Sequence, residues 1–381
     1  MTNRRLHIIV FDIPYPANYG GAIDVFYRLK ALSQSGIKIT LHCFFKGELT
    51  NYNELESLCE KVYYYRRKTT WKQMLHLRPY AVVSRTSDEL LQNLLADNDP
   101  IMFEGLVCCA LMNHPLLAKR TKFLRECNIE HEYFYHLGKS ADNFGNKLYY
   151  FADALRLKFF ERIVKHAQAV LAIAHQDEAH FAVNYPALKV VYLPASHPNT
   201  HVNIPTGLGQ YILYHGNLDV SENYNAARLI AENVASQLPD IPFVFAGRYH
   251  NHNLDSVLAA HPNIRIMPNP SEIEMQQLVR DAQIHLLITA QATGLKLKLL
   301  NVLYNGRHIL VNDKMVEGTD LAPLCVQANS IKELPSLCRK YMTLPVSKED
   351  IALRKKLLGE SYDQLSIISV LHRVLDDFQG L

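Results

Sequence analysis

The sequence predicts an α/β protein made of two doubly wound units, each a parallel sheet with helices on both faces. Three observations support this fold class. The chain has 381 residues, a length that corresponds to two domains. Short β-branched runs alternate with helical patterns along the whole chain, which is typical of parallel sheets. The segment Pro194–Gln210 holds three prolines and two glycines, so we place the boundary between the units there.

The predicted strands are short runs rich in β-branched and aromatic residues, each bounded by turn residues or by a helical pattern. In the first half they are Leu6–Phe11, Ile37–Phe45, Lys61–Tyr65, Ile101–Phe103, Lys122–Glu126, Ala169–Ile173 and Lys189–Leu193. In the second half they are Tyr211–Tyr214, Phe243–Ala246, Ile264–Met267, Ile284–Ile288 and His308–Val311.

Two helix starts are marked by capping-box sequences, in which a serine is followed three residues later by Glu or Gln. Ser271 with Glu274 begins one helix, and Ser361 with Gln364 begins another near the end of the chain. The second helix has an apolar face that needs a surface to cover it. That predicted face consists of Leu365, Ile368, Leu371 and Leu375.

Composition excludes several classes of protein. With 40 Lys plus Arg against 37 Asp plus Glu, the formal net charge of +3 gives no reason to expect a nucleic-acid partner. The seven cysteines show no C-x-x-C spacing, so neither a disulfide framework nor a zinc site is expected, and a cytoplasmic location fits best. The first apolar run is too short for a signal peptide, and no eighteen-residue apolar stretch occurs, so any membrane contact is expected to be peripheral.

In open α/β sheets ligands bind at the carboxyl ends of strands, and two loops there are unusual. After the first strand, Gly20 and Gly21 open a helix whose bare N–H groups could receive an anion. The alternative is a simple glycine turn. A G-x-G-x-x-G motif is absent, so this loop does not indicate a nicotinamide dinucleotide site.

The second loop follows the strand that ends near Ile288. Gly294 opens the backbone at a helix start, and Lys296 and Lys298 bring ammonium groups to the same place. Together they could bind a diphosphate. The alternative is that both lysines are solvated charges on an amphipathic helix.

The motifs in these two loops resemble those of the retaining glycosyltransferases of family four. The resemblance rests on G-x-x-x-K-x-L-x-x-L-x-x-G, which begins at Gly294, and on P-x-P-x-x-x-G-G, which begins at Pro14. Leu213–Leu218 and Phe245–Arg248 resemble the first two strands and turns of the family's donor domain. The likeness implies a GT-B fold, in which two Rossmann-like domains face a cleft and a C-terminal helix crosses back to the first domain.

The resemblance also implies a domain plan. Residues 1–195 would form an acceptor-binding domain and residues 210–355 a nucleotide-sugar-binding domain. Residues 356–381 would form the C-terminal helix that packs on the first domain. The donor substrate would be a nucleotide-diphosphate sugar, with no cofactor and no metal.

By the same resemblance, His131 and Lys298 are the candidate catalytic residues. The candidate substrate-binding residues are Gly20, Gly21, Gly216, Asn217, Arg248, Thr293, Gly294, Lys296 and Asn301.

The chain departs from the family pattern at several of these places. Thr293 and Asn301 stand where two glutamates are usual, Asn217 stands in place of an arginine, and Cys127 stands in place of a histidine. His131 could instead be purely structural, because a His in an acidic neighbourhood often is.

Two further segments bear on partners. Between Arg66 and Arg78 there are five basic residues, no acidic ones, and Trp71. This segment could contact an anionic membrane that presents a lipid-linked acceptor, or its apolar residues could pack inward. The triplet Asp97-Asn98-Asp99 has a D-x-D spacing, but it precedes Pro100 and is predicted to be a turn rather than a metal site.

The leading hypothesis is therefore a sugar-transferring enzyme of cell-envelope polysaccharide biosynthesis. It would move a sugar, with retention, from a nucleotide sugar to a glycan or lipid-linked acceptor, in the cytoplasm or at the inner membrane surface. The missing glutamates favour an alternative, a GT-B scaffold that binds without turnover. A sugar-nucleotide epimerase of the same architecture stays open as a third hypothesis.

Overall fold

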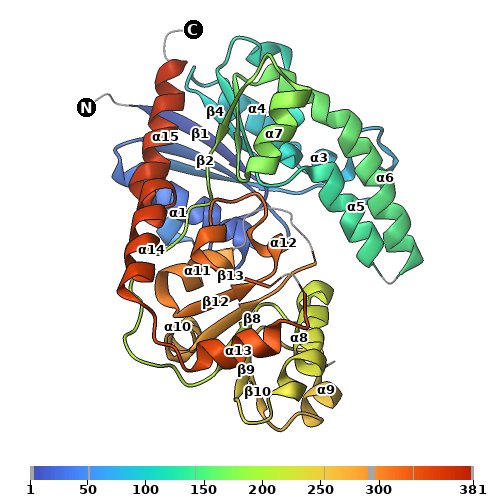
Figure 1. Cartoon of the computed structure of the whole chain (residues 1–381). Coiled ribbons are helices and arrows are strands. Elements are labelled where there is room, and N and C mark those ends of the chain that lie inside the picture. The colour runs from blue at the N-terminus through green and yellow to red at the C-terminus, as the bar shows by residue number, and fades with distance from the viewer. Residues whose placement is uncertain are drawn as a thin grey trace. The chain divides into compact units, whose positions relative to one another are not determined.

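The structure, a computed structural model, describes residues 4–49, 52–141, 143–252, 254–290, 297–328 and 330–378 (Figure 1). The chain forms two compact units. Among the described residues, the first unit holds 4–198 and 364–378, and the second holds 199–290 and 297–363.

The first unit contains a sheet that, within the described residues, has seven strands, all parallel, in the order β3-β2-β1-β4-β5-β6-β7. The strands are β1 Arg5–Val10, β2 Lys38–Phe45, β3 Lys61–Arg66, β4 Ile101–Glu104, β5 Lys122–Glu126, β6 Ala169–Ala172 and β7 Lys189–Tyr192.

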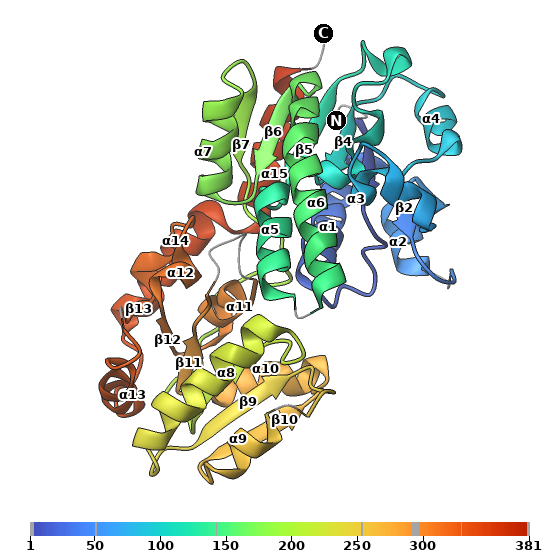
Figure 2. The ribbon, with the colours of Figure 1, turned by 90° about the vertical axis from the view of Figure 1, so that its right-hand side faces the viewer.

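Helices cover both faces of this sheet (Figures 1 and 2). The α-helices are α1 Gly20–Gln34, α2 Asn53–Leu58, α3 Tyr80–Val83, α4 Asp88–Leu94, α5 Glu130–Ser140, α6 Phe144–Phe160, α7 His175–Asn184 and α15 Gln364–Asp377. The 3-10 helices are η1 Trp71–Leu75, η2 Leu106–Leu111, η3 Pro115–Leu117 and η4 Glu161–His166.

The second unit contains a sheet of six parallel strands among its described residues, in the order β10-β9-β8-β11-β12-β13. The strands are β8 Ile212–His215, β9 Phe243–Gly247, β10 Ile264–Pro268, β11 Ile284–Leu287, β12 His308–Val311 and β13 Val326–Gln327. The helices are α8 Ser221–Asn233, η5 Ala235–Gln237, α9 Asp255–Ala259, α10 Glu272–Asp281, α11 Leu297–Asn305, α12 Asp313–Val316, η6 Ala322–Leu324, α13 Leu334–Met342 and α14 Lys348–Ser361.

The predicted fold class is confirmed: both sheets are parallel and doubly wound. The predicted strands are present, with ends that differ by a residue at most positions, and Lys122–Glu126 and His308–Val311 match at both ends. Strand β13 is missing from the prediction, because Val326–Gln327 is too short to stand out as an apolar run. The capping box at Ser271 is also confirmed, since Ser271 Oγ accepts a hydrogen bond from the Glu274 backbone N–H.

Helix α15 begins at Gln364, and Ser361 instead ends α14. The buried side of α15 includes the expected Ile368, Leu371 and Leu375. Leu365 is 82% exposed, so its assignment to the apolar face was wrong. The reason is the helix period: the buried side is centred on Ile367, Leu371 and Val374, and Leu365 points away from it.

Helix α15 belongs to the first unit. It packs against α1, and the Phe378 ring lies 5.8 Å from the ring of Phe123 on β5. The chain passes back at residue 364, later than the expected residue 356. Helix α14 stays with the second unit, where Arg354, almost fully buried, donates a hydrogen bond at 2.7 Å to the Gly306 carbonyl.

Among the described helices, none combines the length and the apolar character that a membrane crossing requires.

Candidate functional site

Each sheet has a point where the strand order reverses, and in open α/β sheets ligands bind at the carboxyl ends of the strands beside that point. In the first sheet this point lies between β1 and β4. In the second it lies between β8 and β11.

At the second sheet's reversal point β8 is followed by a turn that begins at Gly216. Gly216 donates its N–H to the Ala246 carbonyl at 3.0 Å. Gly247 adopts φ 140, and a Cβ added to it would lie 1.8 Å from the Gly216 carbonyl oxygen. A side chain at Gly247 is therefore excluded both by the backbone conformation and by the neighbouring strand.

The ammonium of Lys298 lies beside this turn. Lys298 Nζ donates to Asn223 Oδ1 at 3.2 Å and lies 5.5 Å from the centre of the Tyr214 ring. The Asn223 side chain in turn lies 3.2 Å from the position a Cβ would take at Gly216, and its amide donates to the Asn217 carbonyl at 3.0 Å. The structure thus brings together Gly216, Asn217 and Lys298 from the predicted set.

A carboxylate that the sequence analysis did not single out lies at the same edge. Glu222, in the first turn of α8, accepts a hydrogen bond from the hydroxyl of Thr289, which follows β11. Asn312, after β12, donates to the Thr289 carbonyl at 2.7 Å. The sequence signal for Glu222 was its place just after a strand and a glycine turn, but the strand order is what brings it to Thr289.

Other predicted donor-site residues have different surroundings. The Arg248 side chain is 67% exposed, and its Nε lies 3.4 Å from Asp219 Oδ2. Asn301 Oδ1 accepts a hydrogen bond from Asn305 one turn further along α11, at 3.1 Å. Thr293, Gly294 and Lys296 lie outside the described residues.

At the first sheet's reversal point, α1 begins at Gly20 directly after the loop that follows β1. A Cβ at Gly21 would lie 2.8 Å from the Phe11 ring, so this glycine lets the helix start approach the end of β1. Tyr19, at the N-cap, provides no side-chain hydrogen bond to the first turn. The first N–H groups of α1 are therefore not satisfied by a capping side chain.

Buried charges fix α1 to this sheet. Arg28 donates to Asp24 Oδ2 at 2.9 Å and to Glu104 Oε2, at the end of β4, at 2.6 Å. Arg125 on β5 lies 3.3 Å from the same Asp24 oxygen. Burial by itself would raise the pKa of Asp24, but the two guanidinium groups outweigh it and the pKa is lowered. Asp24 is therefore ionised and holds α1 in place.

Three carboxyl groups near the ends of β5 and β6 have raised pKa values. Glu126 is 1% exposed, and within the described part of the chain neither of its carboxylate oxygens has a hydrogen-bond partner. Burial raises its pKa well above the usual range, and Glu130 and Asp177 raise it further. Burial likewise raises the pKa of Glu130 and of Asp177 to about 7 each. Carboxyl groups that titrate near neutrality can give or take a proton during a reaction.

His131 occupies the second position of α5, just after β5. Its Nδ1 lies 3.2 Å from Glu161 Oε2, and His180 Nε2 lies 3.0 Å from Glu161 Oε1. Because a carboxylate only accepts, Nδ1 of His131 carries the proton in this contact. Burial opposes ionisation of Glu161, but the hydrogen bonds from His131 and His180 lower its pKa to about 2. The pair Glu161–His131 has the arrangement of a carboxylate that orients an imidazole.

Cys127, which stands where family members carry a histidine, has a pKa raised well above its usual range by burial. It remains a neutral thiol near pH 7 and cannot replace a ring donor.

In the basic segment Arg66–Arg78 the apolar side chains are exposed rather than packed inward. Trp71 is 67% exposed, Leu75 73% and Leu77 94%. The second alternative of the sequence analysis, inward packing, is therefore wrong for these residues.

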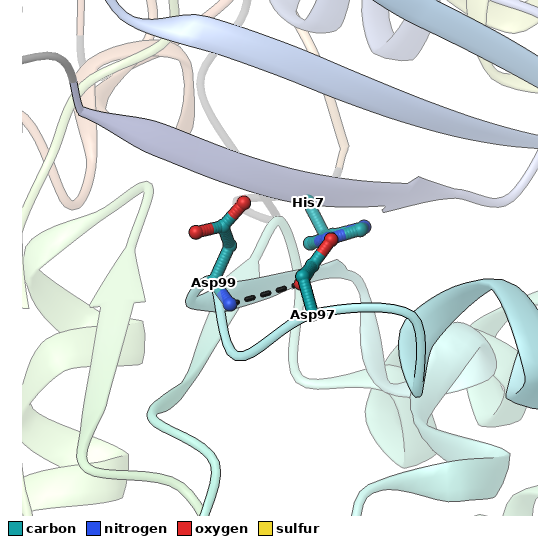
Figure 3. A group of neighbouring side chains, drawn as sticks. All are labelled: His7, Asp97 and Asp99. Carbon is teal, nitrogen blue, oxygen red and sulfur yellow. Dashed lines mark hydrogen bonds and ion pairs between the residues drawn. The ribbon is translucent and has the colours of Figure 1, made fainter.

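The triplet at Asp97 forms the predicted turn, since Asp97 Oδ1 accepts the backbone N–H of Asp99 at 2.9 Å. Among the described residues, His7, Asp97 and Asp99 bring ligand-type atoms within 4.8 Å of one another (Figure 3). Arg120 already places its guanidinium 3.1 Å from Asp97 Oδ1. This cluster lies before β4 and beside the first half of β1, at the amino ends of these strands and not at the carboxyl ends, where ligands bind. We therefore interpret it as a turn held by an ion pair.

The comparisons with known proteins agree with this architecture. No family model matches the chain. A Klebsiella pneumoniae relative described as an uncharacterized 44.6 kDa protein in the cps region is 25% identical over 336 residues, covering 83% of this chain and 84% of the relative. The solved structure of TarM has a TM-score of 0.67 at 10% identity, covering 100% of this chain and 99% of TarM.

Two further solved structures align as completely. Sucrose-phosphate synthase from Thermosynechococcus elongatus has a TM-score of 0.67 at 11% identity, covering 98% of this chain and 99% of the enzyme. HepE from Anabaena, crystallised with UDP and glucose, has a TM-score of 0.63 at 9% identity, covering 98% of this chain and 100% of HepE. The chain has the GT-B fold. In each sheet, the point where the strand order reverses lies beside the candidate site residues described for that unit.

Proposed function

We propose that this protein is a glycosyltransferase that moves a sugar from a nucleotide-diphosphate sugar to a glycan or lipid-linked acceptor. The observation that carries the proposal is the position of Lys298 Nζ, held by Asn223 beside the Gly216 turn and the first turn of α8. A cation next to the first turn of α8, whose N–H groups receive no hydrogen bond from the side chain at the N-cap, is suited to a diphosphate at a reversal point of a parallel sheet.

The comparisons support this class of reaction. The structural neighbours TarM and sucrose-phosphate synthase are glycosyltransferases, and HepE was crystallised with UDP and glucose. The position of the K. pneumoniae relative in a cps region supports capsule, a cell-envelope polysaccharide, as the product pathway.

In the proposed reaction the bond from the anomeric carbon to the diphosphate oxygen breaks, the acceptor hydroxyl oxygen forms the new bond, and the hydroxyl proton passes to the leaving diphosphate. The leaving diphosphate gains negative charge, which Lys298 and the first N–H groups of α8 would stabilise without a metal. Glu222 and Thr289 lie at the same strand ends and would hydrogen-bond hydroxyl groups of the sugar or ribose. Retention of configuration follows from the resemblance to family four.

The first unit would bind the acceptor at the carboxyl ends of β1, β4 and β5. His131, oriented by Glu161, would contact the transferred sugar or the acceptor hydroxyl. Glu130, whose pKa is raised to about 7, is suited to exchange a proton at neutral pH. Gly20 and Gly21 would present the first N–H groups of α1 to a negatively charged group of either substrate.

One observation favours the alternative of a binding scaffold without turnover. Asn301, which stands where family members carry the second glutamate, already shares its side-chain oxygen with Asn305. A single experiment separates the two functions. The full-length protein is titrated by calorimetry with UDP-, GDP- and CMP-linked sugars, and each donor that binds is then tested for hydrolysis and for transfer to envelope glycans.

We expect one nucleotide class to bind and its sugar to be released or transferred. Binding without turnover across acceptors would assign the scaffold function instead. If no donor bound, the assignment of the Gly216–Lys298 edge to a diphosphate would have to be abandoned.

A further inference from the structure

Helix α6, Phe144–Phe160, carries an exposed row of large apolar side chains that we call the α6 stripe. At intervals of three or four residues these side chains share one face of a helix. The α6 stripe consists of Phe144, Leu148, Phe151, Leu155 and Phe159, which are 80%, 62%, 37%, 58% and 60% exposed. Single exposed apolar residues are ordinary, but an ordered row of five along one helix face is not.

The opposite side of α6 is fully used by the first unit. Asp153 accepts the backbone N–H groups of Tyr80 and Ala81 at the start of α3, at 2.9 and 3.3 Å. Leu157 is completely buried, and the Tyr149 ring lies 6.0 Å from that of Tyr80. The stripe is therefore not the core-facing side of a displaced helix. It is a second apolar face that, among the described residues, stays exposed except at Phe151, which packs partly against α5.

The charges along α6 are arranged for a negatively charged partner. Lys147 and Lys158 lie on one flank of the stripe, and Arg162 follows the helix with its guanidinium 5.9 Å from the Phe159 ring. Within Phe144–Phe160, all of which the structure describes, Asp153 is the one carboxylate, and its side chain is fully buried. The exposed surface of α6 thus combines apolar and basic side chains without an acidic one.

The stripe is held in a rigid setting by the neighbouring helix. Helices α5 and α6 lie side by side as a hairpin (Figures 1 and 2). A Cβ at Gly138 of α5 would lie 2.9 Å from the Phe151 ring, and Tyr135 lies 5.4 Å from the same ring. Lys139 places its ammonium 4.6 Å from the Tyr135 ring, next to the stripe. The stripe is therefore preformed, and binding through it costs little conformational entropy.

We propose that the α6 stripe docks on the surface of an anionic membrane, with its apolar side chains in the interface and Lys147 and Lys158 at the lipid phosphates. An exposed apolar row flanked by lysines is the pattern of an interfacial helix that lies in the membrane plane. The charge of the flanks selects anionic lipid over a neutral apolar partner. This proposal does not depend on the proposed transferase activity. It also differs from the Arg66–Arg78 segment, which emerges beside α3 on the other side of α6.

The test uses the full-length protein and vesicle co-sedimentation. Vesicles of phosphatidylglycerol with phosphatidylethanolamine are compared with vesicles of phosphatidylcholine alone, at low and at high salt. The stripe variant is the double substitution Leu148→Ser and Leu155→Ser. Its matched control is Ile273→Ser on α10, an apolar residue that is 80% exposed in the second unit. A third variant, Trp71→Ser with Leu75→Ser, tests the Arg66–Arg78 segment.

We expect the wild-type protein and Ile273→Ser to bind anionic vesicles, more weakly at high salt, and the stripe variant to bind at least about tenfold more weakly. Thermal melting keeps the comparison interpretable, because removing exposed side chains should leave the midpoint unchanged. Three results would each overturn the proposal: equal binding to phosphatidylcholine, loss of binding in the Trp71/Leu75 variant with the stripe variant unaffected, or no vesicle binding at all.

Light scattering on the same samples tests the other occupant, a second copy of the chain. A dimer in the wild-type protein that the stripe variant dissociates would also overturn membrane docking. Donor titrations on the stripe variant keep the two proposals apart, since vesicle binding can be lost while nucleotide-sugar binding is retained.

Discussion

Lys298 Nζ donates a hydrogen bond to Asn223 Oδ1 at 3.2 Å, and this contact joins two residues 75 positions apart at the reversal point of the second sheet. The contact fixes a long, flexible ammonium side chain beside the Gly216 turn. It therefore converts a surface-type lysine into one with a defined position, which a diphosphate site requires.

We predict that Lys298→Ala weakens nucleotide-sugar binding by about tenfold to a hundredfold, since a charge-assisted contact to phosphate is lost. Lys340→Ala on α13 is the control. Lys340 is exposed, and the carbonyl of its neighbour Tyr341 accepts a hydrogen bond from Gln283, which directly precedes β11. Lys340 therefore lies near the amino end of β11, whereas the proposed donor site is at the carboxyl ends of the strands. Calorimetric titration of both variants with the bound donor measures the effect. Equal affinities in the two variants would remove Lys298 from the donor site.

The histidines that share Glu161 offer a matched pair. We predict that His131→Ala lowers the rate of sugar transfer by about 10² to 10⁴ fold, in the range for loss of a group that moves a proton. His180→Ala removes the other histidine contact to Glu161 but should leave the transfer rate within a few fold, because His180 lies in the middle of α7 and not at the start of a helix that directly follows a strand. Similar losses of melting temperature in both variants, with similar transfer rates, would show that His131 is structural.

The raised pKa of Asp177 predicts that the stability of the protein depends on pH. Its folded-state pKa is raised to about 7 by burial, so the folded protein is penalised as pH rises from near 4, where the carboxyl in the unfolded chain ionises, to about 7. Asp177→Asn removes this penalty. We expect its free energy of unfolding to exceed that of the wild-type protein by on the order of 2 kcal/mol at pH 8, with little difference at pH 4.

Glu161→Gln should change the free energy of unfolding in the opposite direction to Asp177→Asn. The pKa of Glu161 is lowered to about 2, so its ionised form stabilises the fold above about pH 4.5, and this contribution is lost as pH falls through 2. The glutamine variant should therefore be less stable than the wild-type protein at pH 8. Calorimetric melting at pH 2, 4 and 8 measures both effects, and an Asp177→Asn variant that is destabilised at pH 8 would contradict the burial argument.

The close packing at Gly247 predicts that a side chain at this position would disturb the proposed donor site. Gly247→Ala would place a Cβ 1.8 Å from the Gly216 carbonyl oxygen at a φ of 140, so we expect a loss of at least about 2 kcal/mol in stability and loss of donor binding. Gly359→Ala in α14 is the control, because among the described residues nothing beyond its own stretch of helix lies within 4 Å of its added Cβ, and it should be neutral or stabilising by about 0.5 to 1 kcal/mol. Denaturant unfolding of both variants checks the difference.

Local sequence patterns were enough to predict the individual strands and helix starts. Strand runs such as Lys122–Glu126 and His308–Val311 were predicted at both ends, and the capping box at Ser271 set the start of α10. These features depend on residues within one or two turns of one another, so a linear pattern contains them. The same is true of the glycine turn at Gly216, which lies directly after a strand.

The tertiary structure decided which distant residues meet. The strand order brings Glu222 to Thr289 and Asn223 to Lys298, and it buries Glu126 among other carboxyl groups. It also leaves one apolar face of α6 uncovered, although apolar periodicity alone would assign that face to the core. The physical reason is that sequence period fixes which side chains share a face, whereas burial, pKa and ion pairing depend on what packs against that face from elsewhere in the chain.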